Sequence, residues 1–276
     1  MDEGVIVVCR LCAITAHFSV PDVRNTLLDR MMLLSAAEGQ KSGWGVCDGK
    51  SIHKGTGLYG QDSEWLTPKS EFTGNIAVGH VRLASVGMGL RRAESHPYSM
   101  RGFVFLHNGQ FYGTANKLWD DDDPDTDSWR AAQIYEARYG SEVNVANVNE
   151  WLGNFWQGTA YACMWLKKDV IYISRNVLRD LFYVTIPQQA GIEAPGFMVN
   201  TSERVLTGAC NYLKTMYNVE TSNVAPFAAK ALYKIEYGSD RAEVSALNYT
   251  LQPVPKLWKI KNTIYQRTGW IEKPRS

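Results

Sequence analysis

The chain alternates between runs of apolar, β-branched residues and a smaller number of stretches with helical periodicity. The runs that predict β-strands are residues 5–15, 42–46, 75–84, 102–106, 159–166, 170–175, 181–185 and 196–200, with two weaker strands within 229–250. The stretches that predict helices are residues 21–37, 128–135, 146–153 and 203–214. Many strands and few helices in a mixed order indicate an α+β fold in which stacked sheets are covered by helices.

The first predicted strand, residues 5–15, is rich in apolar and β-branched residues, as is typical of a central strand. Side chains alternate between the two faces of a strand. Two sets therefore face opposite ways, Cys9, Leu11 and Ala13 on one side and Arg10, Cys12 and Ile14 on the other. We expect this strand to lie in the core of the domain.

Glycine-containing motifs predict where several strands turn or approach one another. Asp48-Gly49 and His53-Lys54-Gly55 are typical of hairpin turns. His107-Asn108-Gly109 is a strong turn signal that should end the strand 102–106. Gly43-Trp44-Gly45 predicts either a β-bulge or a close approach of two backbones, with the Trp ring in the core.

Length and charge exclude several classes of protein. The 276 residues are enough for one large domain or two small ones, and 45% of them are hydrophobic, which supports a sizeable core. The net charge of +1 gives no electrostatic attraction to nucleic acid or to an anionic membrane. The sequence has no run of 18 apolar residues, and Asp2 and Glu3 precede only a short apolar run, so we expect neither a membrane span nor a secretory signal.

The cysteines indicate a reducing environment. Five occur in the chain: Cys9, Cys12, Cys47, Cys163 and Cys210. An odd and sparse set in a chain of this length does not suit a disulfide framework, so the cytoplasm is expected. Cys9 and Cys12 form a C-x-x-C motif, but no second pair completes a tetrahedral zinc site. A thioredoxin-type pair should open a helix, whereas this one lies in an expected strand. We expect neither a metal nor another cofactor.

Five short motifs follow one another along the chain. They are Cys9-x-Leu11-x-Ala13, Ser42–Val46, Gly79–Ser85, His96-Pro97 followed by His107-Asn108-Gly109, and Asp125-Thr126-Asp127. Each is weak alone, but their order and spacing resemble those of the class II glutamine amidotransferases, which are N-terminal-nucleophile (Ntn) hydrolases. A strand ending in Ser174-Arg175-Asn176 and a helix opening at Thr201-Ser202-Glu203 agree with this resemblance, which covers roughly residues 9–215.

The resemblance implies a fold and a division of the chain. The expected fold is a four-layer αββα sandwich of two stacked, mainly antiparallel sheets. Residues 9–250 would form the amidotransferase-like domain, and residues 251–276 a basic C-terminal tail. Three departures leave the amide substrate open: Ser42 replaces an acidic residue, Val86 a histidine common in sugar-type members, and Pro124 a serine.

The resemblance also implies the reacting groups. Cys9 would attack the carboxamide of glutamine and form a γ-glutamyl thioester, releasing ammonia. Its own α-amino group would be the base, because an unperturbed pKa of about 7.7–8.0 leaves much of this amine neutral near neutral pH. The side-chain amide of Asn108 and the backbone N–H of Gly109 would bind the tetrahedral oxyanion.

Other residues would recognise the amino-acid end of the substrate. By resemblance, Arg82 would bind the α-carboxylate with its planar fork, Ser85 would add a hydroxyl donor, and Asp125 would bind the α-ammonium, with Asp127 as its rival. Structural alternatives are a salt bridge for Arg82, a turn for Asn108 and a helix cap for either aspartate. The residues expected to pack or orient their neighbours rather than to catalyse are His80, His96 and His107.

Eight residues, Met1–Val8, precede Cys9, and an internal cysteine has an amide nitrogen that cannot act as the base. Three interpretations stay open. Met1–Val8 is a propeptide that is removed autocatalytically, or translation starts at Val8 through a GTG codon and the initiator methionine is trimmed. In the third, Met1–Val8 is retained and the protein is a catalytically inactive Ntn-fold protein with a binding or structural role.

The sequence leaves the ammonia acceptor open. Residues 216–276 are too few for the synthase domain that larger members of the family carry in the same chain. Ammonia would therefore pass to a separate synthase subunit, or the protein would be a stand-alone hydrolase of glutamine or a related amide. A different amidohydrolase of the same fold, without a preference for glutamine, is a further alternative. A homo-oligomer also stays open, and neither nucleic acid nor a membrane is expected as a partner.

Overall fold

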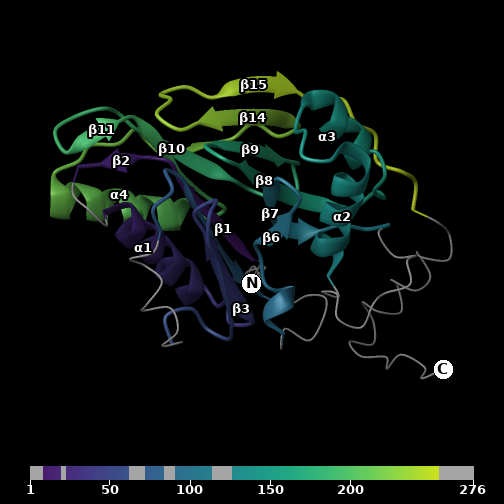
Figure 1. Cartoon of the computed structure of the whole chain (residues 1–276), viewed down its shortest axis with the longest axis horizontal. Helices are drawn as coiled ribbons and strands as arrows, with labels where there is room; N and C mark the ends of the chain where they lie inside the picture. Colours follow the sequence, from purple (N-terminus) through teal and green to yellow (C-terminus); the bar gives the residue numbers. More distant parts are fainter. Residues whose placement is uncertain (1–8, 20–22, 62–71, 84–90, 114–125, 255–276) are drawn as a thin grey trace, which may run out of the picture.

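The computed structural model describes residues 9–19, 23–61, 72–83, 91–113 and 126–254. Within them, two large antiparallel sheets are stacked, and a pair of helices covers the outer face of each sheet (Figure 1). The fold is therefore the α+β, four-layer αββα sandwich that the resemblance implied. None of the helices in this part of the chain is long and apolar enough to cross a membrane.

The first sheet has seven strands with β1 in the middle. In spatial order they are β13 (Ala225–Pro226), β10 (Phe182–Ile186), β12 (Gly196–Asn200), β1 (Arg10–Ile14), β5 (Ala77–Arg82), β3 (Gly43–Cys47) and β4 (Ile52–Thr56). β1 pairs antiparallel with both of its neighbours, so that Ala13 lies opposite Val78 on β5 and Val199 on β12. The central position predicted for this strand is confirmed.

The second sheet has six strands, and β7 lies next to its edge. In spatial order they are β15 (Glu243–Ala246), β14 (Ala231–Glu236), β9 (Val170–Arg175), β8 (Ala160–Lys167), β7 (Phe103–Gln110) and β6 (Tyr98–Met100). A separate short pair is formed by β2 (His17–Phe18) and β11 (Ile192–Ala194).

The helices form the two outer layers. They are α1 (Val23–Ala37) and α4 (Glu203–Tyr217) over the first sheet, and α2 (Asp127–Tyr139) and α3 (Val145–Leu152) over the second. A short 3-10 helix, η3 (Arg92–Glu94), precedes β6. Each of these four α-helices overlaps a segment predicted to be helical.

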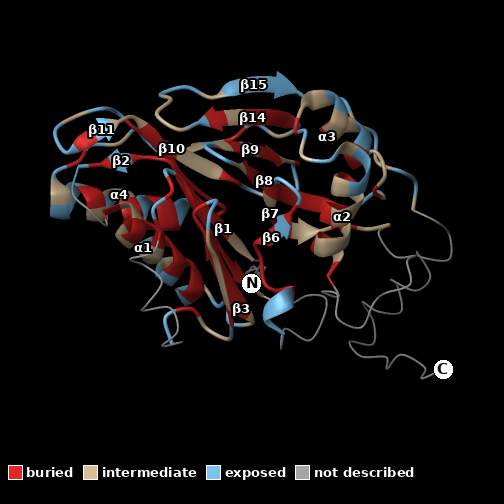
Figure 2. Cartoon of the chain, in the orientation of Figure 1, coloured by how far each residue is buried: buried red, intermediate tan, exposed pale blue. Residues whose placement is uncertain are grey.

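Three apolar layers result, and Figure 2 shows the inner strands as mostly buried. Cys12 and Ile14 of β1 pack with the layer that contains α1 and α4. Leu11 and Ala13 pack in the layer between the two sheets. The two faces predicted for this strand are therefore confirmed, and the face with Leu11 and Ala13, on which Cys9 was predicted to lie, is the face toward the second sheet.

Two predicted turns are strands in the structure. β7 continues through His107-Asn108-Gly109, because Asn108 pairs with Ala162 and Gly109 with Tyr161 on β8. This ladder outweighs the local preference of Asn-Gly for a turn. His53-Lys54-Gly55 likewise lies inside β4, paired with β3. The hairpin turn predicted at Asp48-Gly49 is confirmed, because it joins these two strands.

Gly45 marks the place where two backbones meet closely. A Cβ atom on Gly45 would lie 1.9 Å from the His96 carbonyl oxygen and 2.9 Å from Pro97 Cδ. The neighbouring Trp44 is buried, as predicted, and its ring fills the space that a Cβ on Gly55 would need. Of the two interpretations of Gly43-Trp44-Gly45, the close approach is therefore correct.

Replacing Gly45 by alanine tests this contact. The added methyl group would overlap a backbone carbonyl, so we expect Gly45→Ala to lower the free energy of unfolding by about 1–3 kcal/mol or more. Gly153→Ala is a matched control, because Gly153 has helical backbone angles and its Cβ would meet no atom closer than 3.4 Å. That change should stay within about 0.5 kcal/mol. Urea unfolding measures both, and equal midpoints for the two variants would contradict the close approach.

Candidate active site

Cys9 lies immediately before β1, at the end of the first sheet where β5 also ends. The register that pairs Arg10 with Val81 brings Cys9 beside the residues that follow Val81. Cys9 Sγ lies 3.3 Å from the Leu83 backbone nitrogen, which donates to it, and 3.4 Å from the Leu83 carbonyl oxygen. The thiol is therefore held by the backbone of the Gly79–Ser85 motif.

Arg82, the last residue of β5, is part of a buried ion pair. Its Nη1 donates to Glu94 Oε2 at 3.0 Å, and each of these side chains is only 5% exposed. Glu94 lies in η3, and Arg91 Nε approaches its other carboxylate oxygen at 3.4 Å. The salt bridge considered as the structural alternative for Arg82 is thus present.

Asn108 and Gly109 lie on β7, in the second sheet. Gly109 has φ +140°, and a Cβ there would lie 1.9 Å from the Ala160 carbonyl oxygen, so glycine is required. Asn108 follows Leu106 by two residues and projects in the same direction, between the sheets. Its side chain is buried, and its Oδ1 has no hydrogen-bond partner among the described residues. Cys9 projects from β1 into the same space, because it precedes Leu11 by two residues.

The start of α2 contributes an acidic group. Thr126 is the cap of α2, since its Oγ1 accepts a hydrogen bond from the Trp129 N–H at 3.1 Å. The cap role considered for Asp127 is therefore wrong, because Asp127 is the first residue of the helix itself. Asp127 Oδ2 instead accepts the N–H of Phe111 at 2.6 Å, which ties the start of α2 to the end of β7. Asp125 and the candidate donor Ser85 lie outside the described residues.

Tyr98 connects the two sides of the site. Its hydroxyl lies 2.8 Å from the Glu94 carbonyl oxygen, to which it donates, and 2.8 Å from Thr126 Oγ1. Glu94 holds Arg82, and Thr126 begins the helix that carries Asp127. One buried phenol thereby links the segment that holds the guanidinium to the segment that holds the carboxylate.

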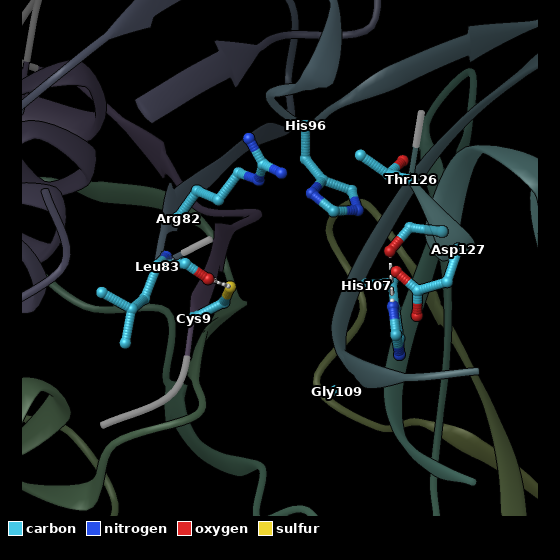
Figure 3. A pocket seen from close by; sticks show the side chains of 9 residues that line it. Cys9, Arg82, Leu83, His96, His107, Gly109, Thr126 and Asp127 are labelled. Atoms are coloured by element: carbon cyan, nitrogen blue, oxygen red, sulfur yellow. Dashed lines mark hydrogen bonds between the residues drawn. The ribbon is translucent and has the colours of Figure 1, made fainter. Parts of the chain in front are cut away.

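These segments enclose one pocket, which Figure 3 shows from close by. The residues that line it are Cys9, Arg82, Leu83, His96, His107, Gly109, Thr126, Asp127 and Ser128. In Figure 3, Cys9 and Leu83 lie on one side, His107 and Asp127 on the other, and His96 between the two groups. A thiol, a guanidinium and a carboxylate therefore share a single small space.

Removal from water changes the acidity of two groups in the pocket. It raises the pKa of the Cys9 thiol above its usual value, although the Leu83 backbone and the charge of Arg82 act in the opposite direction. It also raises the pKa of Asp127 to about 6, against the hydrogen bond from Phe111. At neutral pH the thiol is therefore protonated, whereas Asp127 is mostly ionised.

Three histidines around the pocket are neutral at physiological pH. Burial lowers the pKa of His80 and of His107 to about 3, and it holds the pKa of His96 well below its usual value. His107 Nδ1 lies 2.7 Å from Ser128 Oγ, and His80 Nε2 lies 3.1 Å from the His107 carbonyl oxygen. His96 packs on His80 with ring centroids 4.1 Å apart. Neutral buried rings are suited to packing and hydrogen bonding, and poorly suited to carrying protons at neutral pH.

The structure brings only some of the predicted site residues together. Cys9, Arg82 and Gly109 line the pocket, and Asn108 adjoins it on β7. Sequence reasoning missed Glu94, because a lone glutamate outside any motif carries no signal. No group of three or more His, Cys, Asp or Glu side chains that could hold a metal ion occurs in the described part of the chain.

This chain is similar to known proteins in its three-dimensional structure. No family model and no curated protein sequence matches this chain. The structure is similar to that of the allosteric regulatory enzyme of purine biosynthesis, with a TM-score of 0.64 and 16% sequence identity. It is also similar to glutamine phosphoribosylpyrophosphate amidotransferase from B. subtilis, with a TM-score of 0.62 and 15% identity. Both alignments cover 88% of this chain and 50% of the other, so this chain spans about half the length of these enzymes.

A shorter protein matches over nearly its whole length. It is a glutamine aminotransferase class-II domain protein from Silicibacter pomeroyi, with a TM-score of 0.52, 12% identity and coverage of 87% of this chain and 99% of that one. Identities this low bear on the fold alone. The stacked antiparallel sheets and these likenesses together establish that this chain has the Ntn-hydrolase fold of class II glutamine amidotransferase domains.

Proposed function

We propose that this chain is a glutamine-dependent amidohydrolase of the amidotransferase type, with Cys9 as an N-terminal nucleophile. The observation that carries the proposal is the pocket shared by the Cys9 thiol, the Arg82 guanidinium and the Asp127 carboxylate. A thiol that shares a pocket with a cation and an anion suits an amino-acid substrate, whose carboxylate and ammonium groups carry the complementary charges. The fold adds support, because the structures that it resembles include an amidotransferase that uses glutamine.

The proposed base is the α-amino group of Cys9 itself. Because burial keeps the thiol protonated, the reaction needs a group that takes this proton as the sulfur attacks the carboxamide carbon. The amine then passes the proton to the departing nitrogen, so ammonia leaves and a γ-glutamyl thioester remains. Water, deprotonated by the same amine, hydrolyses the thioester to glutamate and restores the thiol.

The proposed oxyanion site comes from β7. The backbone N–H of Gly109 and the side-chain amide of Asn108 would donate to the oxygen that becomes negative when the thiolate attacks. Gly109 lines the pocket, and its backbone conformation and close packing on Ala160 exclude a side chain. One such preorganised donor typically contributes roughly 3 kcal/mol to the stability of the transition state.

Arg82 and Asp127 are the proposed contacts of the amino-acid end of glutamine. Arg82 would bind the α-carboxylate, while Glu94 and Tyr98 hold its guanidinium at the pocket wall. We propose Asp127 rather than Asp125 as the α-ammonium contact, because Asp127 lines the pocket and is mostly ionised at neutral pH. Ser85 stays a proposed hydroxyl donor.

The reaction requires a free α-amine on Cys9, so we propose that the bond between Val8 and Cys9 is cleaved. A protein that keeps Met1–Val8 would have the fold without the base, which is the inactive alternative. Ammonia would pass to a separate synthase subunit or be released by simple hydrolysis. The five cysteines, all in the described residues, form no disulfide, which supports the reducing cytoplasm as the proposed location.

Intact mass measurement tests the nucleophile. We expect the purified protein to lack Met1–Val8 and to gain one adduct after treatment with 6-diazo-5-oxo-L-norleucine, an electrophilic mimic of glutamine. Cys9→Ala should give no adduct, whereas Cys210→Ala, a control at another partly exposed thiol, should react like the unchanged protein. A full-length mass without an adduct would favour the inactive alternative and end the proposal of catalysis.

A pair of matched substitutions tests the ammonium contact. Asp127→Asn should raise the KM for glutamine by about tenfold or more, because a hydrogen bond to a charged group contributes roughly 1.5–3 kcal/mol. The kcat should change much less, since the contact is made equally in the ground state and the transition state. Asp125→Asn is the control and should leave both constants nearly unchanged. The reverse pattern would assign the role to Asp125.

The raised pKa of Asp127 predicts how binding depends on pH. Above about pH 6 the carboxylate is ionised and pairs with the α-ammonium, and below this pH protonation removes its charge. Glutamine binding to Cys9→Ala should therefore weaken by about tenfold per pH unit below pH 6. Calorimetric titration of this variant avoids turnover and the titration of the nucleophile. A constant affinity between about pH 4.5 and 8 would exclude Asp127 as the ammonium contact.

A further inference from the structure

We propose that Ser202, Glu38 and Arg10 form a positioning relay that holds Cys9, the nucleophile, in its reactive orientation. The inference rests on the proposed function, because it concerns the nucleophile of that reaction. It assigns a role to a charged residue directly after the nucleophile, and to the Thr201-Ser202-Glu203 motif, which the catalytic proposal leaves unused.

The three side chains are connected by short polar contacts. Glu38 Oε2 accepts from Arg10 Nε at 2.7 Å, and Glu38 Oε1 accepts from the Ser202 hydroxyl at 2.9 Å. Arg10 Nη1 in turn lies 3.4 Å from the Cys9 carbonyl oxygen. The ion pair is largely shielded from water, with side-chain exposures of 14% for Arg10 and 18% for Glu38. One carboxylate therefore connects the cap of α4 to the backbone of the nucleophile.

Glu38 lies at the C-terminal end of α1, where a negative charge is unfavourable. Glu38 follows Ala37, the last residue of α1, where the exposed carbonyl groups of a helix disfavour a negative charge. The last turn of α1 contains no basic residue that would offset this effect. The charge is instead compensated from β1 and α4, by Arg10 and Ser202. The negative charge of Glu38, which the end of α1 disfavours, is thus stabilised by Arg10, the residue next to Cys9.

Cys9 needs such support because it lies beyond the hydrogen-bond ladders of β1. Pairing with β12 begins only at Cys12, and pairing with β5 begins at Arg10. Thr201 extends the β12 side by one residue, since its N–H donates to the Leu11 carbonyl at 3.2 Å and its Oγ1 accepts the Leu11 N–H at 3.1 Å. The Cys9 carbonyl is the next group along the same edge of β1, beyond Leu11. It is contacted by the Arg10 side chain, which belongs to the relay.

A positioning role makes a specific kinetic prediction. Neither Arg10 nor Glu38 lines the pocket, so their loss should leave glutamine binding largely intact. A displaced nucleophile, in contrast, slows the attack, and a shift of about 1 Å can reduce a rate by about 100-fold. The relay should therefore affect kcat rather than KM.

The test uses Glu38→Gln, Arg10→Gln and the double variant in the full chain. Each single change should lower the kcat for glutamine hydrolysis by about tenfold or more, with KM changed by less than about twofold. The double variant should be no slower than the slower single variant, because the two residues act as one unit. Alkylation of Cys9 by iodoacetamide, followed by peptide mass spectrometry, should become about threefold faster or more, since a released thiol is more accessible.

Two controls separate positioning from stability. Lys234→Gln, on β14, removes the charged partner of Glu236 on the same strand and of Glu243 on β15, so neither kcat nor Cys9 alkylation should change. Ser202→Ala removes the relay contact together with the cap of α4, and Asn144→Ala removes only the cap of α3. If the relay operates, Ser202→Ala should slow turnover and Asn144→Ala should not, although both lose thermal stability.

The outcomes distinguish the relay from the proposed function. Unchanged kcat and unchanged Cys9 alkylation in Glu38→Gln would overturn the relay while leaving glutamine hydrolysis by the unchanged protein intact. Independent, multiplicative losses in the double variant would overturn it as well. If the unchanged protein does not hydrolyse glutamine, the proposed function fails, and the alkylation rates of Cys9 alone then decide whether the relay holds this residue.

Discussion

The antiparallel ladder that places β1 between β5 and β12 is the constraint on which the candidate site depends. It carries Cys9 to the end of the first sheet, next to Leu83, whose backbone groups contact the thiol. The same ladder directs alternate side chains of β1 either to the outer helices or to the second sheet. A slip of one residue would turn the Cys9 side chain toward the helices and remove it from the pocket.

The second sheet and its helices supply the opposite wall. The ladder between β7 and β8 holds Gly109 opposite Tyr161, and the hydrogen bond from Phe111 to Asp127 ties α2 to the end of β7. The Tyr98 hydroxyl joins this wall to the segment that holds Arg82. The thiol and the cation thus come from the first sheet, whereas the anion comes from α2 over the second sheet. The separation of the anion from the other two groups therefore depends on the packing of the sheets.

Positive charge in and beside the pocket is balanced by two glutamates, one in η3 and one directly after α1. A buried guanidinium is costly unless it is paired, and Glu94 provides the pair for Arg82. Glu38 provides a similar pair for Arg10 beside Cys9. The three histidines stay neutral because burial disfavours their charged forms, so they add polar groups to the site without adding charge.

The sequence by itself determined most of the longer strands, the four α-helices, the central place of β1 and the motif residues that are proposed as the site. These features are local, because they follow from the alternation of side chains and from short motifs. It could not predict that His107-Asn108-Gly109 is a strand, that Glu94 pairs with Arg82, or that Asp127 lines the pocket. Only the tertiary structure decided these points, because each depends on a partner brought close by strand pairing and sheet packing rather than by neighbourhood in the chain.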